Sequence, residues 1–134
     1  MSGIYEKAKE QLLQAGLNLS SLDLKVVLID VADYAVDLVN HDFLDDVAVA
    51  ARVATSGNLT SKTFAQGVFD AADITIAAVT GDVSEALIIY YDSGAAATSR
   101  LICYIDAGTG LPFTPNGGDL TIAWDAGANK IFKL

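Results

Sequence analysis

The amino-acid sequence predicts a mainly β fold, an antiparallel β-sandwich of the Greek-key or jelly-roll kind with one short N-terminal helix. Residues 22–134 contain about seven or eight short runs of β-branched and aromatic residues, with turn signals roughly every 8 to 14 residues. These turns leave no room for the crossover helices that a parallel βαβ fold requires. The chain has 134 residues, 52% of them hydrophobic, so we expect one domain over 1–134 with a single core.

The predicted helix occupies residues 1–16. Residues 3–15 are good helix formers, which favours a helix over a strand. Ser2 is the expected N-cap residue, and Gly16 is expected to end the helix. The apolar residues recur at spacings of four, four and three, as in an amphipathic helix: Ile4, Ala8, Leu12 and Ala15.

The first half of the strand region gives a mixed prediction. Residues 24–30 form an apolar run that predicts a strand covered on both faces. Residues 31–46 are ambiguous between a helix and an irregular loop. Residues 47–55 are expected to form the next strand, and a further one is expected within 74–79.

The second half is clearer. Residues 85–92 and 100–106 predict two buried strands that form an antiparallel hairpin. Residues 108–118, rich in Gly and Pro, predict a long loop that is suited to binding a partner. Residues 120–125 alternate between apolar and polar, as in a half-buried strand, and lysines in 130–134 mark a protected edge strand.

The charge of the chain argues against two classes of partner. Eight Lys and Arg against seventeen Asp and Glu give a net charge of −9, and such a surface repels nucleic acid and anionic lipid. The start of the sequence lacks the basic and apolar regions of a secretory signal, and every apolar run is too short to span a membrane. We therefore expect an aqueous, reducing compartment.

The sequence offers no catalytic or cofactor-binding constellation. Its one cysteine, Cys103, lies within an apolar run, where a buried thiol is expected, and its one histidine, His41, lies 62 positions away. A nucleophilic cysteine needs an exposed, electropositive site beside a base. We therefore expect a protein that is not an enzyme and needs no cofactor.

Six aspartates crowd into residues 30–46, which raises the question of a metal site. A calcium loop needs oxygen ligands at alternating positions around a glycine, and this segment has neither. We expect a solvated acidic face without a metal.

Aromatic side chains leave one binding function open. Tyr91, Trp124 or Phe113 would suit a sugar face. However, neighbouring Tyr90 and Tyr91 point to opposite faces of their strand, so at least one of them belongs to the core or an interface. A packing role is the favoured interpretation, and a glycan-binding β-sandwich module stays as an alternative.

The order of the segments adds a resemblance that covers almost the whole chain. Taken together, the segments are similar to a family of small virion structural proteins from tailed bacteriophages. The segments that carry this resemblance are 4–10, 24–30, 51–54, 67–71, 86–92, 100–106, 110–112 and 116–134.

This resemblance implies a non-enzymatic capsid decoration or cementing protein that stabilises the shell. Its partners would be the major capsid protein and copies of itself, in a virion assembled in the host cytoplasm. A tail, neck or fibre-associated module is the alternative within the virion. Apolar residues in segments that should be exposed then give the expected interface: Ile4, Tyr5, Leu12, Leu111 and Phe113.

Overall fold

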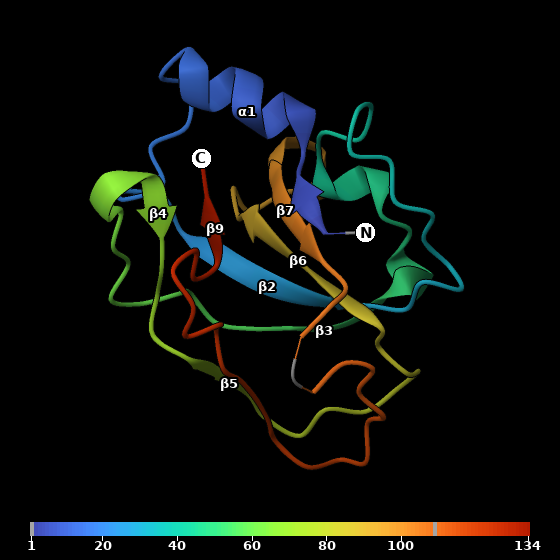
Figure 1. Ribbon diagram of the computed structural model, residues 1–134. Helices are drawn as coiled ribbons and strands as arrows, with labels where there is room; N and C mark the ends of the chain where they lie inside the picture. The colour runs from blue at the N-terminus through green and yellow to red at the C-terminus, as the bar shows by residue number, and fades with distance from the viewer. Residues whose placement is uncertain (1, 109) are drawn as a thin grey trace.

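A computed structural model describes residues 2–108 and 110–134 of the chain. Within these residues the fold is mainly β, with one α-helix and short 3₁₀ turns, and every strand pairing is antiparallel. In Figure 1 the helix lies across one end of a central sheet, and smaller strand pairs lie beside that sheet. The prediction of a mainly β antiparallel fold with one helix is confirmed.

The central sheet has five strands in the order β1-β7-β6-β2-β3. β2 and β6 pair over six residues and are almost fully buried, as expected for their continuous apolar runs. β6 and β7 form the predicted antiparallel hairpin. The strands are β1 (Gly3–Ile4), β2 (Leu24–Ile29), β3 (Arg52–Thr55), β6 (Ala86–Tyr91) and β7 (Leu101–Ile105).

The other strands in the described part of the chain form two separate pairs. β4 (Val68–Phe69) pairs with β9 (Phe132–Lys133), and β5 (Ile74–Ile76) pairs with β8 (Leu120–Ile122). The sheets are open, so they do not establish the second layer of a sandwich.

The strand predicted over 47–55 is shorter in the structure. A 3₁₀ turn occupies Val49–Ala51, and β3 begins at Arg52. The Arg52 guanidinium donates hydrogen bonds to the carbonyl oxygens of Val47 and Leu44, each at 2.9 Å. The Ala51 N–H donates to the Ala48 carbonyl oxygen at 2.9 Å, so the backbone closes a 3₁₀ turn within the first part of the predicted strand.

The helix α1 (Glu6–Leu13) is shorter than predicted. Ser2 does not cap it, because its hydroxyl donates to Asp106 at 3.0 Å and the next two residues pair with β7 as β1. Tyr5 takes the N-cap position instead, without a capping hydrogen bond from its side chain. At the other end, Ala15 and not Gly16 adopts the left-handed conformation that ends the helix (φ 60°), and the Gly16 N–H donates to the Gln11 carbonyl at 2.8 Å.

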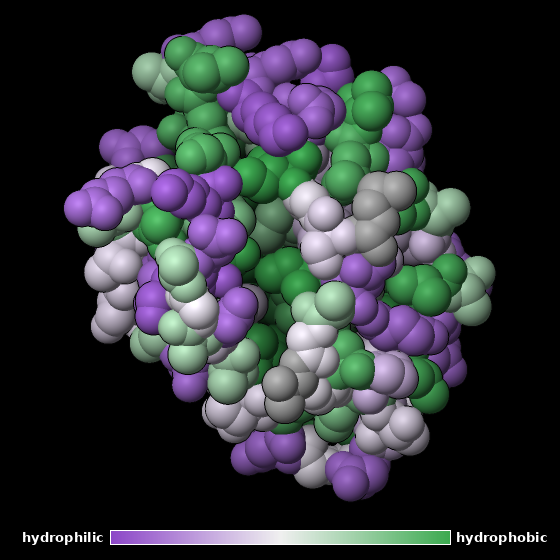
Figure 2. Space-filling model, in the orientation of Figure 1, coloured by the Kyte–Doolittle hydropathy of each residue, from purple (hydrophilic) through white to green (hydrophobic). Residues whose placement is uncertain are grey.

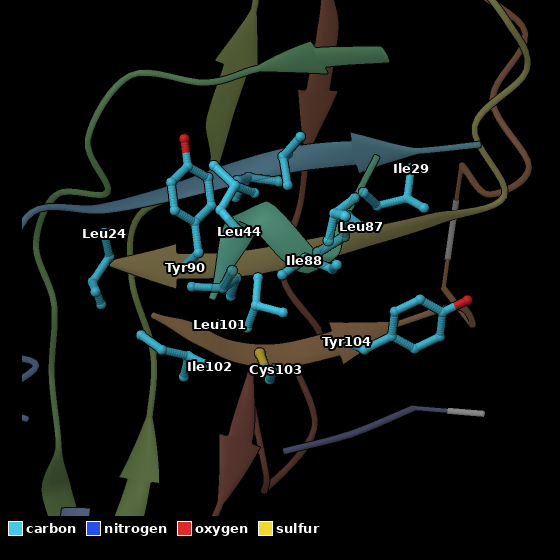
Figure 3. Packing of buried hydrophobic residues seen from close by; sticks show 14 of the residues in the cluster. Leu24, Ile29, Leu44, Leu87, Ile88, Tyr90, Leu101, Ile102, Cys103 and Tyr104 are labelled. Carbon is cyan, nitrogen blue, oxygen red and sulfur yellow. The ribbon is translucent and has the colours of Figure 1, made fainter. Parts of the chain in front are cut away.

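The core is built on β2, β6 and β7, and Figure 3 shows their side chains packed together. Cys103 lies within this cluster and is buried, as predicted. The fully buried side chains include Leu24, Leu28, Ile29, Ile88, Ile89, Leu101 and Ile102.

Candidate functional site

Two grooves open on either side of β9. The groove between β9 and the end of α1, which we call the α1 groove, has a volume of about 560 Å³. The groove between β9 and β1, which we call the β1 groove, has a volume of about 630 Å³. Phe132 and Leu134 line both grooves, so the C-terminal segment forms the ridge between them.

The grooves are mainly apolar. Figure 2 shows a hollow in the centre of this face whose floor is hydrophobic and whose rim is partly hydrophilic. Leu12, Leu17 and Phe64 contribute to the α1 groove. Ile4, Ile105 and Ile131 contribute to the β1 groove. The side chain of Leu134 is 65% exposed on the ridge, so the described chain leaves apolar surface open here.

Aromatic packing and backbone bonds hold the ridge in place. The Phe69 ring contacts Phe132 at 5.3 Å between centroids and stacks on Phe64 at 5.2 Å. The N–H groups of Ile131 and Leu134 donate to carbonyl oxygens of Phe69 and Gly67, each at 3.0 Å. The ridge is therefore a structured element, and a partner would meet a preformed surface.

Lysines border the β1 groove. Lys9 and Lys133 are among its lining residues, and no Asp or Glu of the described chain lines it. Lys9 is already paired with Glu6 at 2.8 Å. Lys133 is exposed, and no ion pair involves it within residues 2–108 and 110–134. This groove thus presents a cation in a chain whose net charge is −9.

The predicted interface residues divide into two groups. Ile4 and Leu12 are half-buried and line the β1 and α1 grooves respectively, so the structure brings them to one face. Leu111 lines a separate pocket of about 70 Å³. Phe113 exchanges backbone hydrogen bonds with Ser84 at 2.7 and 2.9 Å, away from the grooves.

Tyr5 does not fit the expected interface. Its ring is fully buried, and its hydroxyl lies 2.9 Å from that of Tyr34. Burial, helped by the hydrogen bond to Tyr34, raises the pKa of Tyr5 well above its usual range. The premise that this side chain is exposed was wrong, because β1 pairs with β7 and draws the following residue into the core.

Sequence reasoning missed the residues of the ridge itself. The sequence pattern places Phe132 and Leu134 on an edge strand and gives no function to Phe64. The alternation of apolar residues and lysines in 130–134 indicated a half-buried strand. Its partner could not be predicted, because the pairing of β9 with β4 joins residues more than sixty positions apart in the sequence.

The titratable groups considered for catalysis are engaged in packing. Burial raises the pKa of the Cys103 thiol to about 12, so the reactive thiolate is scarce at neutral pH. His41 Nδ1 lies 2.8 Å from the Tyr34 hydroxyl, and their rings are 5.3 Å apart between centroids. Burial also raises the pKa of Tyr34 to about 12.

The aspartates form two groups whose oxygens lie within 4.8 Å of one another: Asp42, Asp45 and Asp46, and Asp30, Asp33 and Asp82. In the first group, burial and the neighbouring Asp46 carboxylate raise the pKa of Asp42. Burial opposes ionisation of Asp46 as well, but N–H bonds from Asp42 and Phe43 outweigh it and lower the pKa of Asp46. Exposed carboxylates commonly cluster without an ion, so these groups do not assign a metal. Asp82 escaped notice because it lies far from the others in sequence.

The aromatic residues considered for glycan binding do not line a common pocket in the described chain. Trp124 lines the 70 Å³ pocket, which has the volume of a few water molecules, and Tyr91 and Phe113 are not among its lining residues. The Trp124 indole N–H donates to the Ala72 carbonyl oxygen at 3.1 Å. This contact favours a packing role for the ring.

Comparison with protein-family models and with curated proteins finds no match to this chain. In the described residues, the one α-helix is too short to cross a membrane.

Proposed function

We propose that this protein is a non-enzymatic structural protein of a tailed-phage virion that decorates the major capsid shell. The observation that carries the proposal is the pair of apolar grooves on either side of β9. Burying such surface in a complex is favourable, because apolar groups are removed from water. The similarity of the segment order to small virion proteins supplies the identity of the proposed partner.

Docking on a shell requires a rigid, complementary surface and no reacting group. The grooves meet this requirement, since an aromatic cluster fixes the ridge between them. Cys103 and His41, which a catalytic role would have used, are instead part of buried or half-buried packing.

The test is co-sedimentation of the purified protein with tail-less phage heads that lack it. We expect the wild-type protein to bind, and Leu134→Glu to lose most binding, because the change places a charge on the ridge that both grooves share. Val49→Glu is the matched control, since Val49 is 76% exposed and lines neither groove.

Cryo-electron microscopy of the decorated heads should then show density at repeated positions over the shell. Binding to isolated tails instead of heads would assign the protein to the tail, neck or fibre. Retention on a glycan array without binding to either particle would favour the glycan-binding alternative. Equal binding of heads by the wild type and Leu134→Glu would remove the grooves from the proposal.

A further inference from the structure

We infer that Asn116 is a site of spontaneous deamidation, and that the opening of the hydrogen bonds between residues 116–119 and residues 78–79 sets its rate in the native protein. The nucleophile is a backbone nitrogen of this chain, and the co-reactant is water. This covalent chemistry is separate from the virion role proposed above.

The sequence contains one asparagine that a glycine follows, Asn116 before Gly117. Gly117 has no side chain, so its backbone nitrogen is unhindered and the local backbone can rotate freely. The turn also requires this glycine, because its φ is +83°. Both residues are exposed, so water reaches them. A larger residue follows each of the other asparagines: Asn18, Asn40, Asn58 and Asn129.

Deamidation forms and breaks defined bonds. The Gly117 nitrogen gives up its proton and attacks the side-chain carbonyl carbon of Asn116, which closes a cyclic succinimide and releases the side-chain nitrogen as ammonia. Water then opens the ring at one of its two carbonyls. Opening at the side-chain carbonyl leaves an aspartate at this position, and opening at the other leaves an isoaspartate, whose main chain runs through the former side chain.

The folded loop engages both reacting groups. The Gly117 N–H donates to the Val79 carbonyl oxygen at 2.8 Å, and the Asn116 side-chain oxygen accepts the Gly118 N–H at 2.9 Å. The Gly117 nitrogen must leave the Val79 carbonyl before it can lose its proton and attack. Deamidation of the native protein therefore proceeds through molecules in which this bond is open.

Two further bonds hold the same turn. The Val79 N–H donates to the Gly118 carbonyl oxygen at 2.9 Å, and the Ala78 N–H donates to the Asp119 carboxylate at 3.0 Å. We call these two bonds and the bond from the Gly117 N–H the Val79 clamp. Val79 is buried, so the clamp is anchored to the core, and Figure 1 shows both segments at the end of the molecule opposite α1.

The test compares deamidation of the native and the guanidinium-unfolded protein at mildly alkaline pH, by mass spectrometry of the peptides. In the unfolded chain, we expect Asn116 to react before the other asparagines. In the native protein, Asn116 should react at least about 10-fold more slowly than in the unfolded chain, because the clamp must open first. Both rates should rise with pH, since attack needs the deprotonated nitrogen.

Two variants of Asp119 separate the clamp from the charge, each native rate being compared with the unfolded rate of the same variant. Asp119→Ala removes the acceptor of the Ala78 N–H, so its native rate should rise several-fold relative to its unfolded rate. Asp119→Asn keeps an acceptor oxygen and loses the charge, so its ratio should match that of the wild type. Asp45→Ala, at another exposed aspartate, is the matched control.

The isoaspartate product should release the clamp. Its main chain is longer by one methylene, so the Gly117 N–H and the Gly118 carbonyl cannot both stay opposite Val79. Hydrogen exchange of the Val79 amide should therefore be faster in the isoaspartate form, isolated by ion exchange, than in the unmodified protein.

Equal rates in the native and unfolded wild type would overturn the inference, because the clamp would then not control the reaction. Two other results would also overturn it. One is an unfolded chain in which Asn116 reacts no faster than the other asparagines. The other is a folded Asp119→Ala, checked by circular dichroism, whose ratio of native to unfolded rates equals that of the wild type.

Discussion

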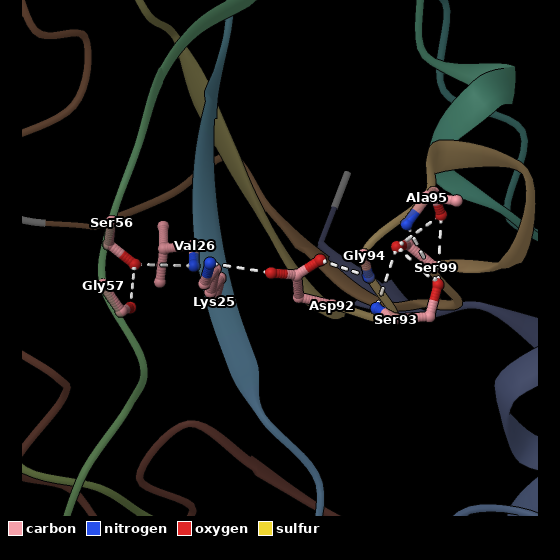
Figure 4. Close-up of polar contacts among 9 residues, drawn as sticks. All are labelled: Lys25, Val26, Ser56, Gly57, Asp92, Ser93, Gly94, Ala95 and Ser99. Carbon is pink, nitrogen blue, oxygen red and sulfur yellow. Dashed lines mark hydrogen bonds and ion pairs between the residues drawn. The ribbon is translucent and has the colours of Figure 1, made fainter.

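The ion pair between Lys25 and Asp92 joins the start of β2 to the end of β6, as Figure 4 shows. The two charged groups lie 2.7 Å apart, and both side chains are mostly shielded from solvent. The hydrogen bond from Lys25, together with the Gly94 N–H, lowers the pKa of Asp92, and the same hydrogen bond raises the pKa of Lys25.

We predict that Asp92→Asn lowers the free energy of unfolding at neutral pH by about 1 kcal/mol. The pKa of Asp92 is lower in the folded state, so its stabilisation exists above the unfolded-state pKa of about 4 and disappears as the pH falls through the folded-state value. Urea titrations across this acidic range should show a shallower loss of stability for the variant. Identical pH profiles would contradict the prediction.

Ser56, which directly follows β3, makes a side-chain hydrogen bond to β2, also visible in Figure 4. Its hydroxyl accepts the Val26 N–H at 2.9 Å and donates to the Gly57 carbonyl oxygen at 2.7 Å. Because Ser56 is buried, Ser56→Ala leaves a buried N–H without its acceptor, and we expect a loss of about 1–3 kcal/mol in urea unfolding. The exposed control Ser20→Ala should change stability by less than about 0.5 kcal/mol.

At the scale of elements, β1 and α1 belong to the core rather than to a detachable arm. Tyr5 and Ala8 are fully buried, and the Glu6 N–H donates to the Leu38 carbonyl oxygen at 2.7 Å. Deleting residues 1–16 would therefore expose the face of β7 that these residues cover, so point variants are the proper test of their role.

We predict that Tyr5→Ala lowers the free energy of unfolding by about 3–5 kcal/mol, because it removes a buried ring and leaves a cavity. Leu13→Ala, at a side chain that is 89% exposed, should change it by less than about 0.5 kcal/mol. Thermal and urea unfolding measure both. A Tyr5→Ala variant as stable as Leu13→Ala would show that the N-terminal segment does not pack as described.

Elements defined by a long local pattern were predictable from the sequence, and features that depend on contacts between distant residues were not. Long apolar runs specify β2, β6 and β7, because burial on both faces requires them. The 3₁₀ turn before β3 was missed because the run of Val and Ala in residues 47–51 fits a short strand as well as a turn. Ser2 looked like a helix cap, but its partner Asp106 lies 104 positions away.

At the scale of the whole molecule, the sequence predicted those residues of the candidate site that lie on a single element with a clear apolar pattern. Ile4 and Leu12 follow from the apolar stripe of the N-terminal segment. The grooves that they line depend on β9 lying beside β4 and β1, and pairings between distant segments cannot be read from local pattern. Leu111 and Phe113 share a loop with the expected features, but the fold places them elsewhere.

Cys103 reports on the stability of the whole fold. It lies in β7, between β1 and β6, and burial raises the pKa of its thiol to about 12. We predict that a thiol reagent such as iodoacetamide modifies the native protein only through unfolding, and modifies the urea-unfolded chain rapidly. Mass spectrometry of samples quenched over time measures both rates.

A core variant gives a second test of this prediction. Ile88 is fully buried in β6, opposite Tyr104 of β7, so Ile88→Ala should cost at least about 2 kcal/mol and speed the modification of Cys103 roughly 30-fold or more. Val39→Ala, at a side chain that is 62% exposed, should leave the rate unchanged. A native protein that reacts as fast as the unfolded chain would contradict the prediction, because the thiol would then be reached from the β1 groove, which Cys103 lines, without breaking the core that Ile88 stabilises.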